Sequence, residues 1–475
     1  MLFNSIDFAI LFPIFFLFYW IVSKKLFLQN ILIVIASYFF YASWNVQFLF
    51  LIIASTLTDF ILSQLIHRYR KKSLIFLCLS LSINLGILLY FKYSGFFISN
   101  FVEIFSFFGQ NFEINELNLI LPVGISFYTF QTLSYTIDVY RGKLQPTKDY
   151  VKFSAFVSFF PQLVAGPIER ANSFLPQFNK ERKFDLYEAN QGMKMILWGL
   201  FKKIVIADNA AYYVNEIFGD FENMNSSALI VGAILFSFQI YGDFSGYSDI
   251  AIGLSKLLGF NLTRNFHFPY FSRDIAEFWR RWHISLTSWF KDYVYIPLGG
   301  SRGGLKVKVR NTFIVFIISG FWHGANWTFI FWGLLNAIFF LPLLVLNRNR
   351  SNLEFDRSTS FISIINITTT FLLTTIAWVF FRSYDIQSAI QYLMGILSYS
   401  VFDIPSVSNI KDLLKLTILL LLLLIIEWKG RYYNFALERL IFLKKKAFRI
   451  LFYYIILFTI LYFGGNEEEF IYFQF

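Results

Sequence analysis

The sequence predicts an all-α, polytopic membrane protein with about 10 to 12 transmembrane helices, and three observations predict this fold class. Hydrophobic residues make up 57% of the 475 positions, charged residues make up 15%, and the mean hydropathy is +0.56. Water-soluble domains carry roughly 25% charged residues. Apolar runs close to the roughly 20 residues that span a bilayer recur along the chain. No repeat or flexible linker interrupts them, so residues 1–475 are expected to form a single integral membrane domain.

The candidate spans follow one another with mostly short polar connections. They lie near residues 6–23, 29–44, 47–64, 73–93, 118–140, 150–165, 226–241, 312–346, 361–381, 412–428 and 447–463. The first run lacks the basic segment and the small-residue cleavage site of a secretory signal, so it is expected to be retained as a span.

Basic residues cluster between the apolar runs rather than along one soluble face. The clusters are residues 24–25, 68–72, 202–203, 348–350 and 444–449. Such loops mark the cytoplasmic side of a membrane protein, and the acidic residues 467–469 are expected outside. The net charge of +11 therefore reflects topology, and no nucleic-acid partner is expected.

Cysteine and histidine are too scarce for a metal centre. Cys78 is the single cysteine and lies in an apolar run, where it is expected to act as a small buried hydrophobic residue. One thiol cannot form an intramolecular disulfide or a thiolate cluster, and the chain has four histidines in total. No metal site is predicted.

Residues 264–310 are too charged to span a bilayer, yet they are rich in aromatic residues. An aromatic stripe at helical spacing contains Trp279, Trp282, His283, Leu286, Phe290 and Tyr293. A polar stripe at the same spacing contains Arg281, Ser285, Ser288 and Asp292. This pattern predicts one amphipathic helix at the membrane interface. The glycine-rich residues 296–304 then predict a tight cytoplasmic turn.

The apolar stretch 312–346 is too long for one straight pass and is interrupted at residues 319–326. Glycines on both sides of His323 predict a broken or bent helix at membrane depth, which is tolerated only where protein or a wet cavity satisfies the backbone. At 1.5 Å per residue, His323 lies about 18 Å beyond Asn311, which is roughly mid-bilayer. Basic clusters flank the stretch on both sides, so the chain is expected to rise and return.

Two histidines are candidates for chemistry. An ionisable side chain inside a membrane run is costly, so His323 is a functional hypothesis by default, and a desolvated neutral imidazole suits a general base. The alternative is a packed histidine that donates to a backbone carbonyl. The same alternatives apply to His283, which falls on the aromatic stripe.

Carboxylates and arginines supply further candidates. Asp243 and Asp249 lie between apolar runs, where they must be paired or line a wet path. They either orient a histidine or bond to arginine or tyrosine. Arg280 and Arg281 match the geometry of phosphate groups, but interfacial anchoring explains them equally well.

Eight segments in a fixed order carry a resemblance to a known family. They are residues 121–131 (LPVGISFYTFQ), 165–170 (AGPIER), 243–249 (DFSGYSD), 277–286 (EFWRRWHISL), 295–300 (YIPLGG), 321–324 (FWHG), 378–382 (WVFFR) and 470–475 (FIYFQF). Together they resemble the membrane-bound O-acyltransferase family, in its bacterial branch of alginate O-acetylases and peptidoglycan O-acetyltransferases. Glu469 departs from the proline that relatives often carry there.

The resemblance implies helices around a central tunnel where two funnels meet. It also implies that His323 is the catalytic histidine and His283 the second characteristic histidine of the family. The residues expected at the substrates are Arg280, Arg281, Asp243, Trp322 and Asn326.

The implied reaction moves acetyl from cytoplasmic acetyl-CoA across the bacterial inner (cytoplasmic) membrane to hydroxyl groups of a cell-envelope glycan, with no bound cofactor. His323 would take the acceptor proton, although a histidine that itself carries the acyl group stays open. Backbone amides near Gly320, Gly324 or Asn326 are candidates for stabilising the oxyanion. Membrane lipids and a periplasmic or surface partner acetyltransferase are the expected further partners.

Three other functions stay open. One is D-alanyl transfer toward teichoic acid from a thioester carrier protein. A second is an acyl exporter that only feeds a separate extracytoplasmic transferase. A third is a solute transporter, for which inverted repeats and paired broken helices are expected. The sequence has one obvious break and no visible repeat, which disfavours the transporter.

Overall fold

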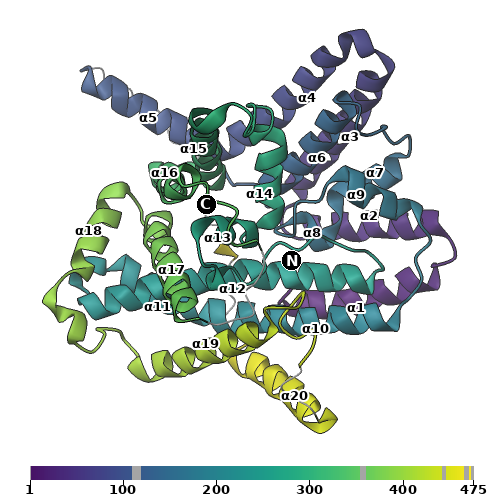
Figure 1. Ribbon diagram of the computed structural model, residues 1–475. Coiled ribbons are helices and arrows are strands. Elements are labelled where there is room, and N and C mark those ends of the chain that lie inside the picture. Colours follow the sequence, from purple (N-terminus) through teal and green to yellow (C-terminus); the bar gives the residue numbers. More distant parts are fainter. Residues whose placement is uncertain (1, 110–118, 354–359, 441–444, 465–469, 472–475) are drawn as a thin grey trace. The chain divides into compact units, whose positions relative to one another are not determined.

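The computed structural model describes residues 2–109, 119–353, 360–440, 445–464 and 470–471 (Figure 1). Every regular element in this part of the chain is a helix, which confirms the predicted all-α class. The acidic residues 467–469 and residues 472–475 of the terminal motif lie outside the described residues.

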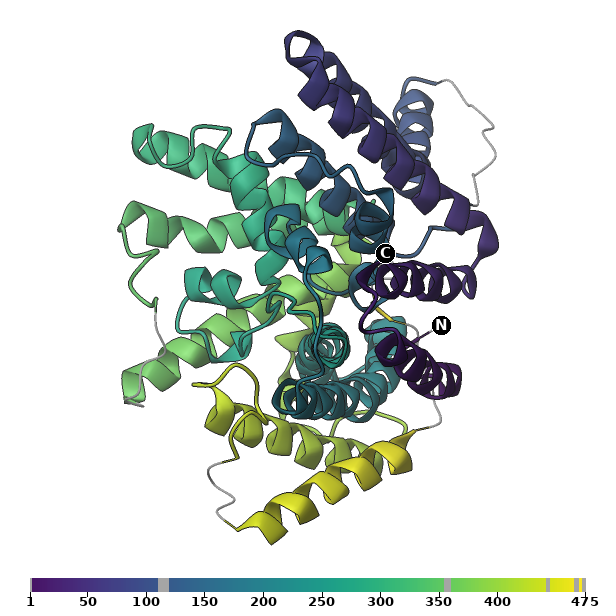
Figure 2. The same cartoon turned by 90° about the vertical axis from the view of Figure 1, so that its right-hand side faces the viewer.

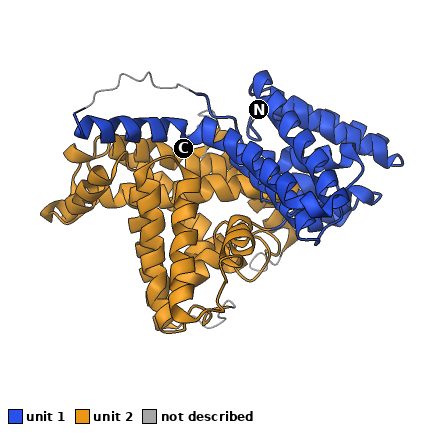
Figure 3. Cartoon of the chain, turned by 90° about the horizontal axis from the view of Figure 1, so that it is seen from above, with its two compact units in different colours: residues 1–192, 254–263 blue, residues 193–253, 264–475 orange. Residues whose placement is uncertain are grey.

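Contacts divide the chain into two compact units, coloured in Figure 3. Unit 1 contains residues 1–192 and 254–263, and unit 2 contains residues 193–253 and 264–475. The single domain over residues 1–475 stays a prediction.

The helices are grouped by unit and follow chain order within each group. Those of unit 1 are α1 (Ile6–Ile21), α2 (Leu26–Ala42), α3 (Val46–Arg68), η1 (Arg70–Lys72), α4 (Ser73–Leu88), η2 (Leu89–Tyr93), α5 (Ser94–Phe107), α6 (Ile125–Tyr140), α7 (Tyr150–Ser158), α8 (Phe160–Leu163), α9 (Ala171–Phe174) and η3 (Leu175–Asn179). Both units contain residues of α10 (Leu186–Leu200) and α12 (Ser226–Leu257). Those of unit 2 are η4 (Phe201–Ala207), α11 (Asp208–Gly219), η5 (Phe221–Asn223), η6 (Pro269–Phe271), α13 (Ile275–Arg281), α14 (Ile284–Phe290), η7 (Lys291–Tyr295), α15 (Gly304–His323), α16 (Trp327–Val345), α17 (Phe361–Arg382), α18 (Ile386–Ile396), η8 (Tyr399–Phe402), α19 (Ile410–Gly430) and α20 (Lys446–Phe463).

Six helical stretches among the described residues are long and apolar enough to cross a membrane. They are Val46–Arg68, Arg70–Phe107, Ser226–Leu257, Trp327–Val345, Phe361–Arg382 and Lys446–Phe463. Helices α1 and α2 are apolar but shorter. The prediction of a multi-pass helical membrane protein is therefore confirmed, while the total of about 10 to 12 spans stays a prediction.

In unit 1, helices α3, α4 and α6 pack against one another around a buried polar cluster. The Asp59 carboxylate accepts hydrogen bonds from the Ser80 hydroxyl at 2.6 Å and from the Asn84 amide at 2.9 and 3.0 Å. These donors offset the cost of burying a carboxylate in an apolar helix. On α4 the expectation for Cys78 is wrong: its side chain is exposed, because it lies on the face of α4 opposite the buried Ser80 and Asn84.

In unit 2, α15 and α16 form an antiparallel pair, so the chain rises and returns as predicted (Figure 1). The break is shorter than expected: α15 stays helical through His323, and only residues 324–326 are non-helical. Asn326 closes this turn. Its side-chain oxygen accepts the Thr328 amide at 3.0 Å, and its side-chain amide donates to the Tyr384 carbonyl at 2.9 Å.

Helices α19 and α20 lie side by side in Figures 1 and 2. Helices α11, α19 and α20 each contact the π-helical segment η4. Their apolar side chains surround η4, which places the charged residues of η4 in the interior of unit 2.

The prediction of a single amphipathic helix over residues 279–293 is wrong. Helix α13 ends at Arg281, α14 begins at Ile284, and His283 between them has a φ of +43°. The Ile284 amide donates to the Asn265 carbonyl at 2.8 Å instead of continuing the helix. The polar stripe is not solvated either, since Arg281 and Ser285 are 5% and 6% exposed.

Candidate active site

His323 is the last residue of α15 and is 3% exposed. Aromatic rings from three helices pack on its imidazole. The ring centroids of Trp322, Trp332 and Phe381 lie 5.0, 5.1 and 5.4 Å from that of His323, each in an edge-on arrangement. Bulky rings from α15, α16 and α17 therefore exclude water from this imidazole and fix its orientation.

The glycines beside His323 allow α15 and α16 to approach closely. A Cβ at Gly320 would lie 2.2 Å from the Phe329 carbonyl oxygen, and one at Gly333 would lie 2.3 Å from the Phe316 carbonyl oxygen. A Cβ at Gly324 would lie 2.1 Å from the Phe329 ring. Packing therefore accounts for these glycines, while the suggested role of their amides at an oxyanion stays a prediction.

Replacing Gly320 by alanine is expected to destabilise the protein by about 1–3 kcal/mol, because the new methyl group overlaps backbone that cannot move aside cheaply. Gly86→Ala on α4 is the matched control, since its Cβ meets nothing within 4 Å. We expect that control to be neutral or slightly stabilising. Thermal unfolding in detergent, followed by tryptophan fluorescence, measures both, and equal midpoints would contradict the prediction.

His283 is 1% exposed, and its protonation is set by Asn265. The Asn265 side-chain oxygen accepts the Ser285 amide at 3.3 Å and the Ser285 hydroxyl at 2.9 Å, and it lies 3.0 Å from Nδ1 of His283. A backbone amide can only donate, so this Asn265 atom is the acceptor, and Nδ1 of the neutral imidazole carries the hydrogen. The lone pair of His283 is therefore on Nε2. Burial lowers the pKa of His283 to about 3, so the ring is neutral at pH 7.

The fold brings the two histidines to one aromatic cluster. The Trp322 ring contacts His323, and its centroid also lies 6.1 Å from that of His283, edge-on. Phe244 of α12 also packs on His283, with ring centroids 4.7 Å apart. Trp322, which was predicted as a site residue, thus contacts both histidines, and His283 connects it to α12.

Asp243 belongs to a buried ion-pair network with lysines. Nζ of Lys203 lies 2.9 Å from Asp243 and 2.7 Å from Asp208. Asp243 also accepts the Ile471 amide at 2.6 Å. The neighbouring Lys202 pairs with Asp249 at 2.7 Å. The carboxylates are therefore paired, but with lysine instead of histidine, arginine or tyrosine.

The assignment of residues 202–203 to a basic loop between apolar runs is wrong, because Lys202 and Lys203 lie in the helical segment η4 and are 2% and 6% exposed inside unit 2. Sequence reasoning counted them only as loop charges. The sequence does contain a sign that these lysines are buried, since both lie within an apolar run. Buried lysines require carboxylate partners.

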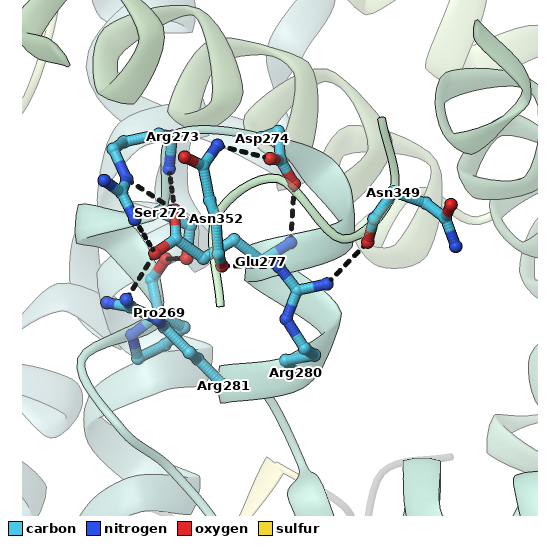
Figure 4. Close-up of polar contacts among 9 residues, drawn as sticks. All are labelled: Pro269, Ser272, Arg273, Asp274, Glu277, Arg280, Arg281, Asn349 and Asn352. Atoms are coloured by element: carbon cyan, nitrogen blue, oxygen red, sulfur yellow. Dashed lines mark hydrogen bonds and ion pairs between the residues drawn. The ribbon is translucent and has the colours of Figure 1, made fainter. Parts of the chain in front are cut away.

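The two arginines proposed for phosphate binding make protein contacts (Figure 4). The guanidinium of Arg280 donates to the carbonyls of Asn349 and Asn352 at 2.9 and 2.7 Å. Arg281 forms an ion pair with Glu277. Phosphate binding by either arginine, and substrate binding by Asn326, which caps α16, stay predictions.

Glu277 is a buried residue that the sequence analysis did not single out. It is 1% exposed and accepts hydrogen bonds from Arg273 at 3.0 and 3.1 Å as well as from Arg281 (Figure 4). Arg281 lies four residues after Glu277 on α13, a spacing that favours contact on one helical face, while Arg273 reaches Glu277 from the segment before the helix. The cluster fixes α13, and through it the segment that leads to His283.

These observations define the class of protein. It is a multi-pass helical membrane protein in which two buried histidines contact one tryptophan. Residues 147–384 match the membrane-bound O-acyltransferase family. The chain belongs to this family.

Three relatives illustrate the range of activities in the family. The chain is 37% identical over 414 residues to the probable alginate O-acetylase AlgI of Pseudomonas aeruginosa, covering 86% of this chain and 77% of that protein. It is 37% identical over 429 residues to the peptidoglycan O-acetyltransferase of Helicobacter pylori, covering 84% and 80%. It is 33% identical over 241 residues to the teichoic acid D-alanyltransferase of Streptococcus thermophilus, covering 46% and 55%.

Proposed function

We propose that this protein is an O-acetyltransferase of the bacterial cytoplasmic membrane. It takes acetyl from cytoplasmic acetyl-CoA and delivers it to a hydroxyl group of an extracytoplasmic glycan, directly or through a partner transferase. The observation that carries the proposal is the contact of Trp322 with both His323 and His283 in a buried cluster. Membership of the family and the long matches to two O-acetylating relatives support the acetyl group as cargo.

In the direct reaction the acceptor oxygen attacks the thioester carbonyl carbon. Nε2 or Nδ1 of His323 takes the hydroxyl proton, the new C–O bond forms, and the C–S bond breaks. The proton then passes from His323 to the departing CoA thiolate, so charge and atoms balance. The ring contacts around His323 hold it in one orientation, and the low polarity of the cluster keeps the imidazole available as a base.

His283 is assigned a positioning role toward the substrates. Asn265 fixes its tautomer and orientation, and its ring packs against Trp322, the neighbour of His323, so His283 helps to hold the cluster against which the substrates would be positioned. Transfer of D-alanine toward teichoic acid is the second candidate, supported by the match to the D-alanyltransferase over 46% of this chain.

The test uses inverted membrane vesicles, whose cytoplasmic face is open to the medium. Vesicles with the wild-type protein receive either acetyl-CoA labelled in the acetyl group or a carrier protein loaded with labelled D-alanine. We expect base-labile label in polymer or partner protein from acetyl-CoA alone, and none in vesicles without the protein. Label from D-alanine but not from acetyl-CoA would overturn the proposal in favour of the second candidate.

A further inference from the structure

A polar cavity lies within unit 2, and its lining contains neither histidine nor any of the aromatic rings that contact them. It has a volume of about 410 Å³ and is lined by residues of α11, α19 and α20. The lining residues are Asp208, Asn209, Tyr212, Tyr213, Asn409, Asp412, Lys415, Leu416, Tyr462 and Phe463. Nothing in the reaction described above uses this cavity.

The lining combines aromatic rings with amides and carboxylates. Tyr212 and Tyr462 are 55% and 75% exposed, so their ring faces are available to a ligand. Asn209 and Asn409 lie beside them, but their side-chain amides already donate to backbone carbonyls and to Asp412, so carboxylate and amide oxygens are the groups that a sugar hydroxyl would meet. Sugars present the matching chemistry, since their C–H faces stack on aromatic rings and their hydroxyls bond to amides and carboxylates.

Hydrogen bonds hold the tyrosine side of the cavity in place before any ligand binds. The Tyr213 hydroxyl donates to the Asn409 carbonyl at 2.8 Å, and the Tyr212 and Ser408 hydroxyls are 3.0 Å apart. Both contacts join α11 to the start of α19. A ligand therefore meets side chains that are already held in place, which lowers the entropy cost of binding.

The distribution of basic residues indicates that this cavity faces the outside of the cell. It lies where α19 begins and α20 ends, and the opposite ends of these helices are strongly basic. The described basic residues at the end of α19, between the two helices and at the start of α20 are Lys429, Arg431, Arg439, Lys445, Lys446 and Arg449, and Arg264 bonds to Asn434 beside them. Lysine and arginine concentrate on the cytoplasmic side, so the cavity opens on the extracytoplasmic side.

The surroundings of the cavity are acidic, which bears on the kind of sugar. Two carboxylates, those of Asp208 and Asp412, lie in the lining, and Glu216 bonds to Ser408 beside Asn409. The lining contains one lysine, Lys415, while Lys203 pairs with Asp208 from the interior. Within the cavity, Lys415 is already paired with Asp412 at 2.7 Å. A polymer with a carboxylate on every sugar would be repelled here.

We propose that this cavity is a subsite for one sugar residue of the acceptor glycan, and that it selects a neutral, amide- or hydroxyl-bearing sugar over a uronate. The inference rests on the proposed function, because it assigns the acceptor of that reaction. The subsite holds the glycan at a distance from the reacting hydroxyl, so its binding energy positions the chain for transfer.

The probes are a soluble tetramer of N-acetylglucosamine and a tetra-uronate of the same length. They are titrated against purified wild-type protein and against Tyr212→Ala and Tyr462→Ala, with tyrosine and tryptophan fluorescence as readout. We expect the neutral tetramer to bind more tightly than the uronate. Each substitution should weaken its binding about 3- to 10-fold, the effect of losing one aromatic contact.

Two controls separate this inference from the proposed function. Tyr399→Ala removes a fully exposed tyrosine that does not line the cavity, and it should bind the tetramer like wild type. His323→Ala should also bind it like wild type, whatever its transfer activity. Tighter binding of the uronate, equal binding by Tyr212→Ala, Tyr462→Ala and wild type, or no binding at the solubility limit would each overturn the subsite.

If vesicles show no acetyl transfer but the tetramer binds in a tyrosine-dependent way, the proposed function is wrong and the sugar subsite is retained. If acetyl transfer occurs but the tetramer does not bind in a tyrosine-dependent way, the proposed function is retained and the sugar subsite is wrong. This surface would then be available to a partner protein. The two ideas are thus judged by different measurements.

Discussion

Replacing His323 by alanine is expected to lower the rate of acetyl transfer by at least about 100-fold, with little change in the apparent affinity for acetyl-CoA. The reason is that a positioned general base typically contributes 10²- to 10⁴-fold, roughly, to a proton-transfer step. The effect should fall on kcat, because the imidazole acts while the acceptor proton is moving and contributes little to ground-state binding. Initial rates in inverted vesicles, at several acetyl-CoA concentrations, measure both quantities.

His67→Ala is the matched control, since His67 is an exposed histidine of α3 in unit 1 and should leave transfer unchanged. Protein amounts must agree between the variants, and each must unfold above the assay temperature, because removing a ring that packs on Trp332 and Phe381 leaves a cavity and lowers the unfolding midpoint. Full activity of a folded His323→Ala protein would reduce His323 to a packing residue.

His323→Gln tests the chemistry separately from the packing. Glutamine fills part of the space and can hydrogen bond, but it cannot take up a proton near neutral pH. We therefore expect it to restore the unfolding midpoint without restoring the rate. Recovery of the rate would instead favour a hydrogen-bonding role and contradict the role of base.

The sequence predicts the α15–α16 pair well because glycine and charge carry physical information there. Gly320 and Gly333 mark the close approach of the two helices, and arginines on both sides mark the return of the chain. The extent of the break was less predictable. Periodicity does not reveal that Asn326 bonds both Thr328 and Tyr384 and so confines the break to one turn.

The helix expected through His283 shows where periodicity fails. A spacing of three and four residues continues across Trp282 and His283, although the backbone turns there. What decides the conformation is Asn265, eighteen residues earlier, whose carbonyl and side chain take the bonds that a continuous helix would use. Such a long-range competitor leaves no local signal.

The candidate site was predictable residue by residue but not as a network. Ionisable groups in apolar runs singled out His323 and Asp243, since burial of charge is costly wherever the chain folds. Their partners depend on tertiary contacts. Lys203 was mistaken for a loop charge because its sequence neighbours resemble those of a cytoplasmic loop, and only packing against α11 and α12 shows its true environment.

Replacing Lys203 by methionine is expected to destabilise the protein by about 3–5 kcal/mol. Methionine matches the length of lysine, so the substitution removes the charge with little change of volume. It leaves Asp208 and Asp243, 7% and 2% exposed, without the ammonium group that lies 2.7 and 2.9 Å from them. Removing one partner of a buried ion pair carries this cost because an uncompensated charge remains in the interior. Thermal or denaturant unfolding in detergent measures the change.

Lys415→Met is the matched control, because it removes a lysine of similar length from the exposed pair with Asp412 and should leave the unfolding midpoint unchanged. The decisive variant combines Lys203→Met with Asp208→Asn and Asp243→Asn. Neutralising all three groups removes the uncompensated charge, so the triple variant should be more stable than Lys203→Met alone. If it is less stable, the destabilisation comes from lost packing and hydrogen bonds around η4, and the network does not act through charge.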